Sequence, residues 1–142
     1  MVEVLKVDLS GPQSHLREDY FLLSKRWDKS LGSGSSLFEE TKNPVCVNVA
    51  VYDNSTIGFA VLGKSVIIPN TLEIAAIYID QPHRQRGVGS KLVEQLIQET
   101  KANRFGRISA YTLQNSAFYK LLLKFDFSPT MIGRRLMLIK SL

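Results

Sequence analysis

The segment between residues 84 and 90 carries the residue types that bind a phosphate group. Two arginines supply positive charge, and two glycines, Gly87 and Gly89, lack a Cβ and let an anion approach the backbone closely. An amphipathic helix is predicted to begin near Val88, and the free N–H groups of its first turn would point at the same anion. The sequence therefore predicts a ligand that carries phosphate. The residues of this segment are Arg84, Gln85, Arg86, Gly87, Val88, Gly89 and Ser90.

The segment differs from two common phosphate-binding motifs. Leu92 stands three residues after Gly89, where the dinucleotide-binding motif Gly-x-Gly-x-x-Gly has its last glycine. No Gly-Lys-Ser or Gly-Lys-Thr ends the segment, as it would in a Walker loop. Neither of these motifs therefore identifies the ligand.

The elements around this segment predict one α+β domain that spans residues 1–142. Alternating and β-branched apolar residues predict strands, and apolar residues at spacings of three and four predict helices. The order indicates a mixed, largely antiparallel sheet with helices on both faces. Strands are expected at 2–9, 45–51, 57–62, 71–79, 107–112 and 136–139, and helices at 14–27, 88–102 and 116–124.

The overall charge of the chain favours an anionic ligand or an acidic partner, because the net charge is +5 and the pI is about 9.4. The basic residues are spread out and no RNA-binding or zinc-finger motif is present, so nucleic acid is not the expected partner. No apolar run approaches the roughly 20 residues of a membrane helix, and the first residues do not resemble a signal peptide. A cytoplasmic monomer or homodimer is expected. Cys46, the single cysteine, is predicted to be buried and inert, and no metal site is expected.

The strand, the Arg-x-x-Gly-x-Gly segment and the helix that follows resemble the GNAT superfamily of N-acetyltransferases. The residues that carry the resemblance are 77–80, 84–89 and Leu92, and the resemblance extends over about residues 45 to 140. It implies acetyl-CoA as the acetyl donor, with the pyrophosphate held by the amides of residues 84–90. It also implies that the end of the strand 71–79 splays from its neighbour in the sheet, and that its backbone pairs with the pantetheine arm at Ile77, Tyr78 and Ile79.

A second match to the superfamily lies at Asn115 and Tyr119. The resemblance implies that Asn115 contacts the cosubstrate and that Tyr119 protonates the departing CoA thiolate. A phenol suits this role because a free thiolate is a poor leaving group and needs a proton. The alternative is that Tyr119 packs as a half-buried aromatic ring beside Phe118 and Leu122. The helix ends in residues 125–127, Phe-Asp-Phe, where the superfamily has Gly-Phe or Gly-Tyr.

Glu73 is the candidate general base. The attacking amine must be neutral, yet α-amines titrate near about pH 8 and lysines near about 10.4. Superfamily members commonly place a glutamate where this chain has Ala75, and strand alternation puts Glu73 on the same face as Ala75 and Ile77. The alternatives are that Glu73 is a strand-edge carboxylate paired with a lysine, or that His83 serves as the base.

The resemblance implies an N-acetyltransferase that acts on a primary amine. The spacing of Asn115, Phe118 and Tyr119, together with Trp27 and Pro129, resembles the actin-type N-terminal acetyltransferases, which modify acidic protein N-termini. Three alternatives stay open: a small-molecule amine acetyltransferase, a lysine acetyltransferase, and a non-catalytic acyl-CoA-binding module. The alanine at the usual base position favours the last. The acceptor is expected to bind at the loops 30–42 and 64–70.

Overall fold

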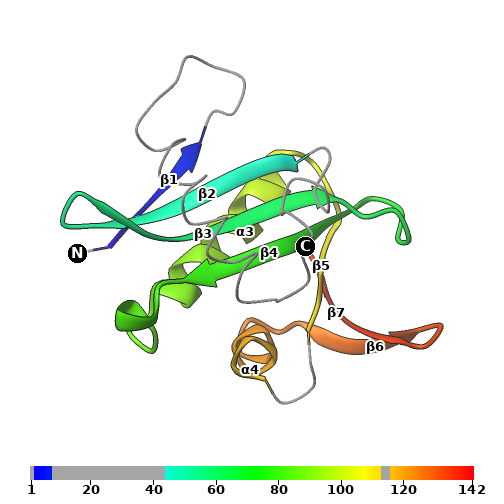
Figure 1. Cartoon of the computed structure of the whole chain (residues 1–142). Coiled ribbons are helices and arrows are strands. Elements are labelled where there is room, and N and C mark those ends of the chain that lie inside the picture. Colours follow the sequence, from blue (N-terminus) through cyan, green and yellow to red (C-terminus); the bar gives the residue numbers. More distant parts are fainter. Residues whose placement is uncertain (1, 8–43, 113–115) are drawn as a thin grey trace, which may run out of the picture.

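The computed structural model describes residues 2–7, 44–112 and 116–142, which form a mixed sheet with helices packed against it (Figure 1). The expected α+β class is confirmed, while the helix expected at 14–27 lies outside the described residues. The strands are β1 (Glu3–Val7), β2 (Pro44–Tyr52), β3 (Ser55–Lys64), β4 (Thr71–Ile79), β5 (Arg107–Tyr111), β6 (Ser128–Ile132) and β7 (Arg135–Ser141). The helices are α3 (Val88–Ala102), α4 (Ala117–Lys124) and the short 3-10 turn η1 (Gln81–His83).

The order of the strands in the sheet is β1-β2-β3-β4-β5-β7-β6. Only β4 and β5 run parallel among these neighbours, and α3 provides the crossover between them. The hairpin between β2 and β3 turns at Asp53 and Asn54, whose φ angles are 50° and 62°. Two successive left-handed residues match the right-handed twist of the flanking strands, which is why asparagine and aspartate are favoured there.

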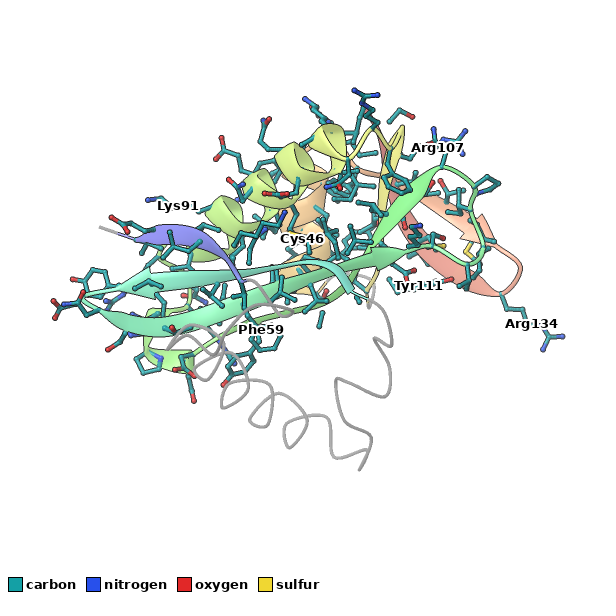
Figure 2. The ribbon with its side chains drawn as sticks, turned by 90° about the horizontal axis from the view of Figure 1, so that it is seen from above. Cys46, Phe59, Lys91, Arg107, Tyr111 and Arg134 are labelled. Atoms are coloured by element: carbon teal, nitrogen blue, oxygen red, sulfur yellow. The ribbon has the colours of Figure 1, made fainter. Side chains whose placement is uncertain are left out.

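Strand β6 was not expected, because the sequence predicts a loop ahead of a single last strand. The structure pairs β6 with β7 from Ser128↔Ile139 to Ile132↔Arg135. Four of its five residues are exposed, so no apolar alternation marks it in the sequence. Pro129 is tolerated because β6 lies at the edge of the described sheet, where one side of its backbone has no strand partner among the described residues. Figure 2 shows Arg134 at the tip of this hairpin, pointing away from the sheet.

The two faces of the sheet carry two separate apolar clusters. The helix-side cluster joins the sheet to α3 and α4 and includes Leu92, Leu96 and Ile108. The opposite cluster includes Val47, Phe59 and Val61. Both described helices therefore cover the same face. The apolar face expected for α3 is confirmed, since Val88, Leu92, Val93, Leu96 and Ile97 are all buried.

Cys46 lies in the helix-side cluster and is 3% exposed. Figure 2 shows it between α3 and the sheet. Burial raises the pKa of its thiol from an ordinary value of 9.0 to about 11, and the nearby Glu99 carboxylate adds to the rise. The thiolate is the reactive form, so the folded protein holds this thiol in its unreactive state at neutral pH.

We therefore expect Cys46 to resist a thiol reagent such as DTNB at pH 8 until the protein unfolds. The unfolded chain ionises this thiol near pH 9 and the folded chain only near pH 11. The free energy of unfolding should thus be unaffected by this group below pH 9 and fall as pH rises through that interval. The rate of labelling in native buffer and in denaturant gives the measurement. Fast labelling of the native protein at pH 8 would contradict this placement of Cys46.

Candidate active site

The end of β4 is open on the side that faces β5. Strand β4 pairs with β5 only from Thr71 to Ile74, whereas it pairs with β3 along its length to Ile79. The two strands diverge beyond the paired part, with α4 beside the wider end (Figure 1). Within the described residues, the backbone from Ala75 to Ile79 therefore has no strand partner on this edge.

Alternation of the backbone decides which groups face this open edge. The N–H of Asp80 donates to the carbonyl of Ile57 on β3 at 2.7 Å. In an antiparallel pair, successive residues point their N–H and C=O groups to opposite sides, so Tyr78 shares the direction of Asp80. The backbone groups of Ile77 and Ile79 consequently face the open edge. Three residues, Ile77, Tyr78 and Ile79, were expected to pair with a pantetheine arm. Two of them, Ile77 and Ile79, direct their backbone N–H and C=O groups toward the open edge.

The segment 84–90 turns the chain from this edge into α3. Gln85 and Gly87 have left-handed φ angles of 62° and 81°, and Gly87 is the N-cap of the helix. No side chain caps this helix start. The first backbone bond of the helix runs from the N–H of Lys91 to the carbonyl of Gly87 at 3.2 Å. The N–H groups of the residues between them are therefore available to a ligand, and the helix dipole favours an anion there.

The two glycines of this segment serve different purposes. A Cβ built on Gly87 would meet no atom within 4 Å, so this glycine keeps open the space above the loop. A Cβ on Gly89 would lie 3.1 Å from Cδ2 of Leu121 and 3.4 Å from Cδ1 of Ile79. Gly89 therefore permits the close packing of α3 against α4 and β4. Both glycines line the cleft described below, Gly87 beside its open space and Gly89 where the helices meet the strand.

The side chain of Arg84 is held in place by the end of β4. Its Nε donates to the carbonyl of Ile79 at 2.8 Å, and its guanidinium lies 5.6 Å from the centre of the Tyr78 ring. The cation over the aromatic face adds to the hydrogen bond in fixing the side chain. The side chain of Arg84 thus bonds to one of the carbonyls on the open edge, and Arg84 belongs to the lining of the cleft described next.

These elements enclose one cleft of about 600 Å³, within the usual range for small-molecule sites. Its walls are the end of β4, the loop, the start of α3 and one side of α4. The side chains of Arg86 and Val88 lie outside the lining, the first exposed and the second buried in the core. Asn115 lies outside the described residues. The lining residues are Ile77, Tyr78, Ile79, Arg84, Gln85, Gly87, Gly89, Ser90, Ala117, Phe118, Lys120, Leu121 and Lys124.

The sequence predicted that this helix contributes Tyr119 to the site, whereas the residues of α4 that line the cleft are Ala117, Phe118, Lys120, Leu121 and Lys124. These lining residues recur at spacings of three and four, which is one side of a helix. The helix starts at the N-cap Ser116, whose Oγ accepts from the N–H of Tyr119 at 3.1 Å. It ends with Asp126 in a left-handed conformation (φ 66°) and Phe127 buried. Asp126 and Phe127 therefore occupy the place of the Gly-Phe ending, because a helix commonly closes on a left-handed residue.

Tyr119, the expected acid, is not among the residues that line the cleft. Its ring is half-buried and packs against the helix-side cluster. The neighbouring Phe118 and Lys120 do line the cleft, so the ring of Tyr119 leaves α4 on another side. This position agrees with the packing alternative. The acid role remains a prediction.

Glu73 does not share a strand face with Ile77, contrary to the sequence expectation. Val61 pairs with Ala76 and the next residue, Leu62, with Ile74, so Ala75 is an extra residue in a β-bulge. The bulge exchanges the faces of the strand, because the residues after it lose the alternation of those before. Ile77 consequently packs toward the helices, whereas Ala75 packs with the opposite cluster.

Neither candidate base lines the cleft. Glu73 is half-buried in the part of β4 that is still paired, with Gly63 and Ser109 as its neighbours on the adjacent strands. His83 is half-buried in η1, with its ring 5.8 Å from that of Tyr52. The structure therefore assembles the expected donor-binding elements but leaves both candidate bases apart from them.

The described residues show neither a metal-binding cluster nor a membrane-spanning helix. No group of three or more histidine, cysteine, aspartate or glutamate side chains there could hold a metal ion. No helix in that part of the chain has the length and apolar character to cross a membrane.

Comparison with protein families identifies the class of this fold and cleft. The family model of the Acetyltransferase (GNAT) family matches residues 6–127. The chain belongs to this family. It is, in general class, an acetyl-CoA-dependent N-acetyltransferase. No curated protein sequence gives a significant match.

Solved structures share the fold at low sequence identity. A Bacillus subtilis acetyltransferase in complex with CoA has a TM-score of 0.71 and 17% identity, with 100% of this chain and 99% of that chain covered. The ribosomal-protein-S18-alanine N-acetyltransferase of Escherichia coli has a TM-score of 0.67 and 16% identity, with coverage of 100% and 93%. An IAA acetyltransferase from Bacillus cereus has a TM-score of 0.65 and 18% identity, with 100% of both chains covered.

Proposed function

We propose that the cleft beside β4 binds acetyl-CoA and that the chain transfers its acetyl group to a protein N-terminal amine. The observation that carries the donor site is the meeting of two features in one cleft. These are the unpaired end of β4 and the uncapped start of α3. The loop and the first turn of α3 suit the pyrophosphate, and the open edge at Ile77 and Ile79 suits the amide groups of a pantetheine arm.

This orientation gives the thioester a defined direction. With the pyrophosphate at the end of β4, the pantetheine arm runs back along the strand toward Ala75. The amine nitrogen attacks the thioester carbonyl, the C–N bond forms and the C–S bond breaks. The amine releases a proton to a base, and the sulfur takes up a proton as the thiol leaves. Strand N–H groups near the bulge would stabilise the negative charge that develops on the carbonyl oxygen.

The basic surface favours an acidic acceptor. The net charge of +5 attracts acidic peptides and increases their rate of encounter. The turn between β3 and β4 lies toward the acetyl end of the proposed donor and exposes Val66 (97% exposed) and Ile67 (47% exposed). Such apolar side chains at a loop can contact the residues that follow a peptide N-terminus.

The direct test of this proposal is acetyl-CoA turnover against a panel of acceptors, read by mass spectrometry. The panel contains N-terminal peptides with acidic and neutral first residues, the same peptides with blocked N-termini and one free lysine, and polyamines. We expect the acidic peptides with free N-termini to gain one acetyl group fastest. Preference for polyamines or for the blocked lysine peptides would overturn the acceptor assignment and leave the donor site intact.

A second function, acyl-CoA binding without transfer, is favoured by two observations. The usual base position holds Ala75, which lies in the bulge, and the expected acid lies outside the cleft lining. Calorimetry with acetyl-CoA separates the two functions. A binding module would bind acetyl-CoA and show no turnover with any member of the panel, whereas a transferase would do both.

The acid assignment predicts a specific effect for Tyr119→Phe, which removes only the hydroxyl. If Tyr119 protonates the leaving sulfur, kcat should fall by about 10²-fold, because general acid catalysis contributes about that much. The Kd for acetyl-CoA should stay within about twofold, since the hydroxyl has no part in donor binding. Steady-state kinetics and calorimetry provide the two measurements. An unchanged kcat would leave Tyr119 as a packing residue of α4.

A further inference from the structure

Two lysines on α4 line the cleft and have no part in the donor site as described so far. Lys120 and Lys124 are both exposed and both belong to the lining. They are four residues apart, so they lie on one side of the helix about 6 Å from each other along its axis. They face the same space as the loop and the start of α3, from the opposite wall.

The charge in this cleft is of one sign. Arg84, Lys120 and Lys124 are its ionised side chains, and no carboxylate is among the lining residues. Between described residues the structure has one ion pair, Lys6 with Glu99 at 3.6 Å, which involves neither lysine. The two ammonium groups are therefore not neutralised by a neighbour in the described part of the chain. Lys124 also lies in the last turn of α4, where a cation complements the helix dipole, but this does not explain Lys120.

We propose that Lys120 and Lys124 bind the 3′-phosphate of coenzyme A and make the enzyme selective for the phosphorylated donor. This inference rests on the proposed function. Coenzyme A carries two kinds of phosphate, a bridging pyrophosphate and a terminal phosphate monoester on the ribose. The backbone N–H groups of the loop and Arg84 serve the first. The monoester carries a charge of about −1.5 to −2 at neutral pH, which two lysines match.

The chemistry of lysine fits the monoester better than the pyrophosphate. An ammonium group is a compact, strongly hydrated charge on a flexible stem, which suits a phosphate at the solvent-exposed mouth of a cleft. The pyrophosphate instead lies against fixed N–H groups at a helix start, where preorganised backbone provides the contacts. The two walls of the cleft thus divide the recognition of one ligand between backbone and side chains.

The test compares CoA with 3′-dephospho-CoA, which lacks only the phosphate in question. Isothermal titration calorimetry at low salt measures both ligands on the wild-type protein and on the double variant Lys120→Gln/Lys124→Gln. The control is Lys101→Gln/Arg134→Gln, which makes the same change in charge at exposed basic residues outside the lining. Circular dichroism checks that each variant is folded.

We expect the wild-type protein to bind CoA about 10- to 100-fold more tightly than dephospho-CoA, as charged hydrogen bonds of this kind do. The double variant should lose this ratio while its Kd for dephospho-CoA stays within about threefold of wild type. The control should keep the ratio. A ratio that survives in the double variant, or a wild-type ratio near one, would overturn the assignment while CoA binding upholds the donor site. Failure of the wild-type protein to bind either ligand would instead overturn the proposed function, and the assignment with it.

Discussion

Gly87→Asp should abolish detectable binding of acetyl-CoA while lowering the free energy of unfolding by only about 1 kcal/mol. The added carboxylate would enter the open space above the loop, where the pyrophosphate is proposed to lie. Two like charges about 4 Å apart repel by about 4 kcal/mol near a protein surface, which corresponds to about three orders of magnitude in Kd. The loss of stability should stay small, because aspartate is one of the residues that tolerate a left-handed backbone, here with a φ of 81°. Calorimetry and thermal unfolding measure the two effects.

Two further variants separate the reasons for that loss. Gly133→Asp puts the same residue at a left-handed position (φ 62°) with no atom within 4 Å of the new Cβ, but in the β6–β7 turn outside the cleft lining. It should leave the Kd unchanged. Gly87→Asn keeps the size and removes the charge, so it should weaken binding by about tenfold at most. Full affinity in Gly87→Asp would show that the phosphate does not bind at this loop.

Gly58→Ala should destabilise the protein and the donor site together. A Cβ at Gly58 would lie 2.7 Å from the carbonyl oxygen of Tyr78 and 3.4 Å from Cα of Ile79. These are backbone atoms of the neighbouring strand, so β3 and β4 must move apart. Overpacking of this kind costs about 2–3 kcal/mol of unfolding free energy, or roughly 10 °C in Tm. Because the displaced residues form a wall of the cleft, the affinity for acetyl-CoA should fall as well.

Gly133→Ala serves as the comparison for this prediction. It also removes a glycine, but the new Cβ meets open space and the cost is limited to about 1 kcal/mol of left-handed strain. A larger loss for Gly58→Ala than for Gly133→Ala is therefore the expected order. The reverse order, or a Gly58→Ala variant as stable as wild type, would mean that β3 and β4 tolerate a side chain between them at this point.

Elements whose burial leaves a clear pattern of apolar residues are predicted well from the sequence. Strand β4 and the start of α3 were predicted at their observed residues, because a continuous apolar run and a 3.6-residue period are both strong signals. Strand β6 was missed because its residues are exposed and it contains a proline. An edge strand is stabilised mainly by pairing with its neighbour, and pairing leaves no periodic signal in a single sequence.

In the candidate site, too, local features could be predicted from the sequence and features that depend on a neighbouring element could not. The turn at residues 84–90 into α3 could be predicted, because the glycines and the start of the helix are local signals. The bulge at Ala75 could not, since one extra residue in a strand becomes visible only when its partner on β3 is known. Regular strand alternation puts Glu73 and Ile77 on one face, which the bulge makes wrong. The lysines of α4 were equally hidden, because their function depends on where the helix docks and not on its own sequence.

Only four residue pairs join β4 to β5. This short junction in an otherwise continuous sheet is called the seam here. On one side lie the strands from β1 to β4, and on the other lie β5, β7 and β6. A bound pantetheine arm would extend the hydrogen bonding of this seam as an added strand does, and would therefore fasten the two halves to each other. Such a ligand at a concentration of 1,000 times its Kd adds about 4 kcal/mol of stability. Amide hydrogen exchange should slow on both sides of the seam when acetyl-CoA binds. The donor would then act as a structural part of the enzyme.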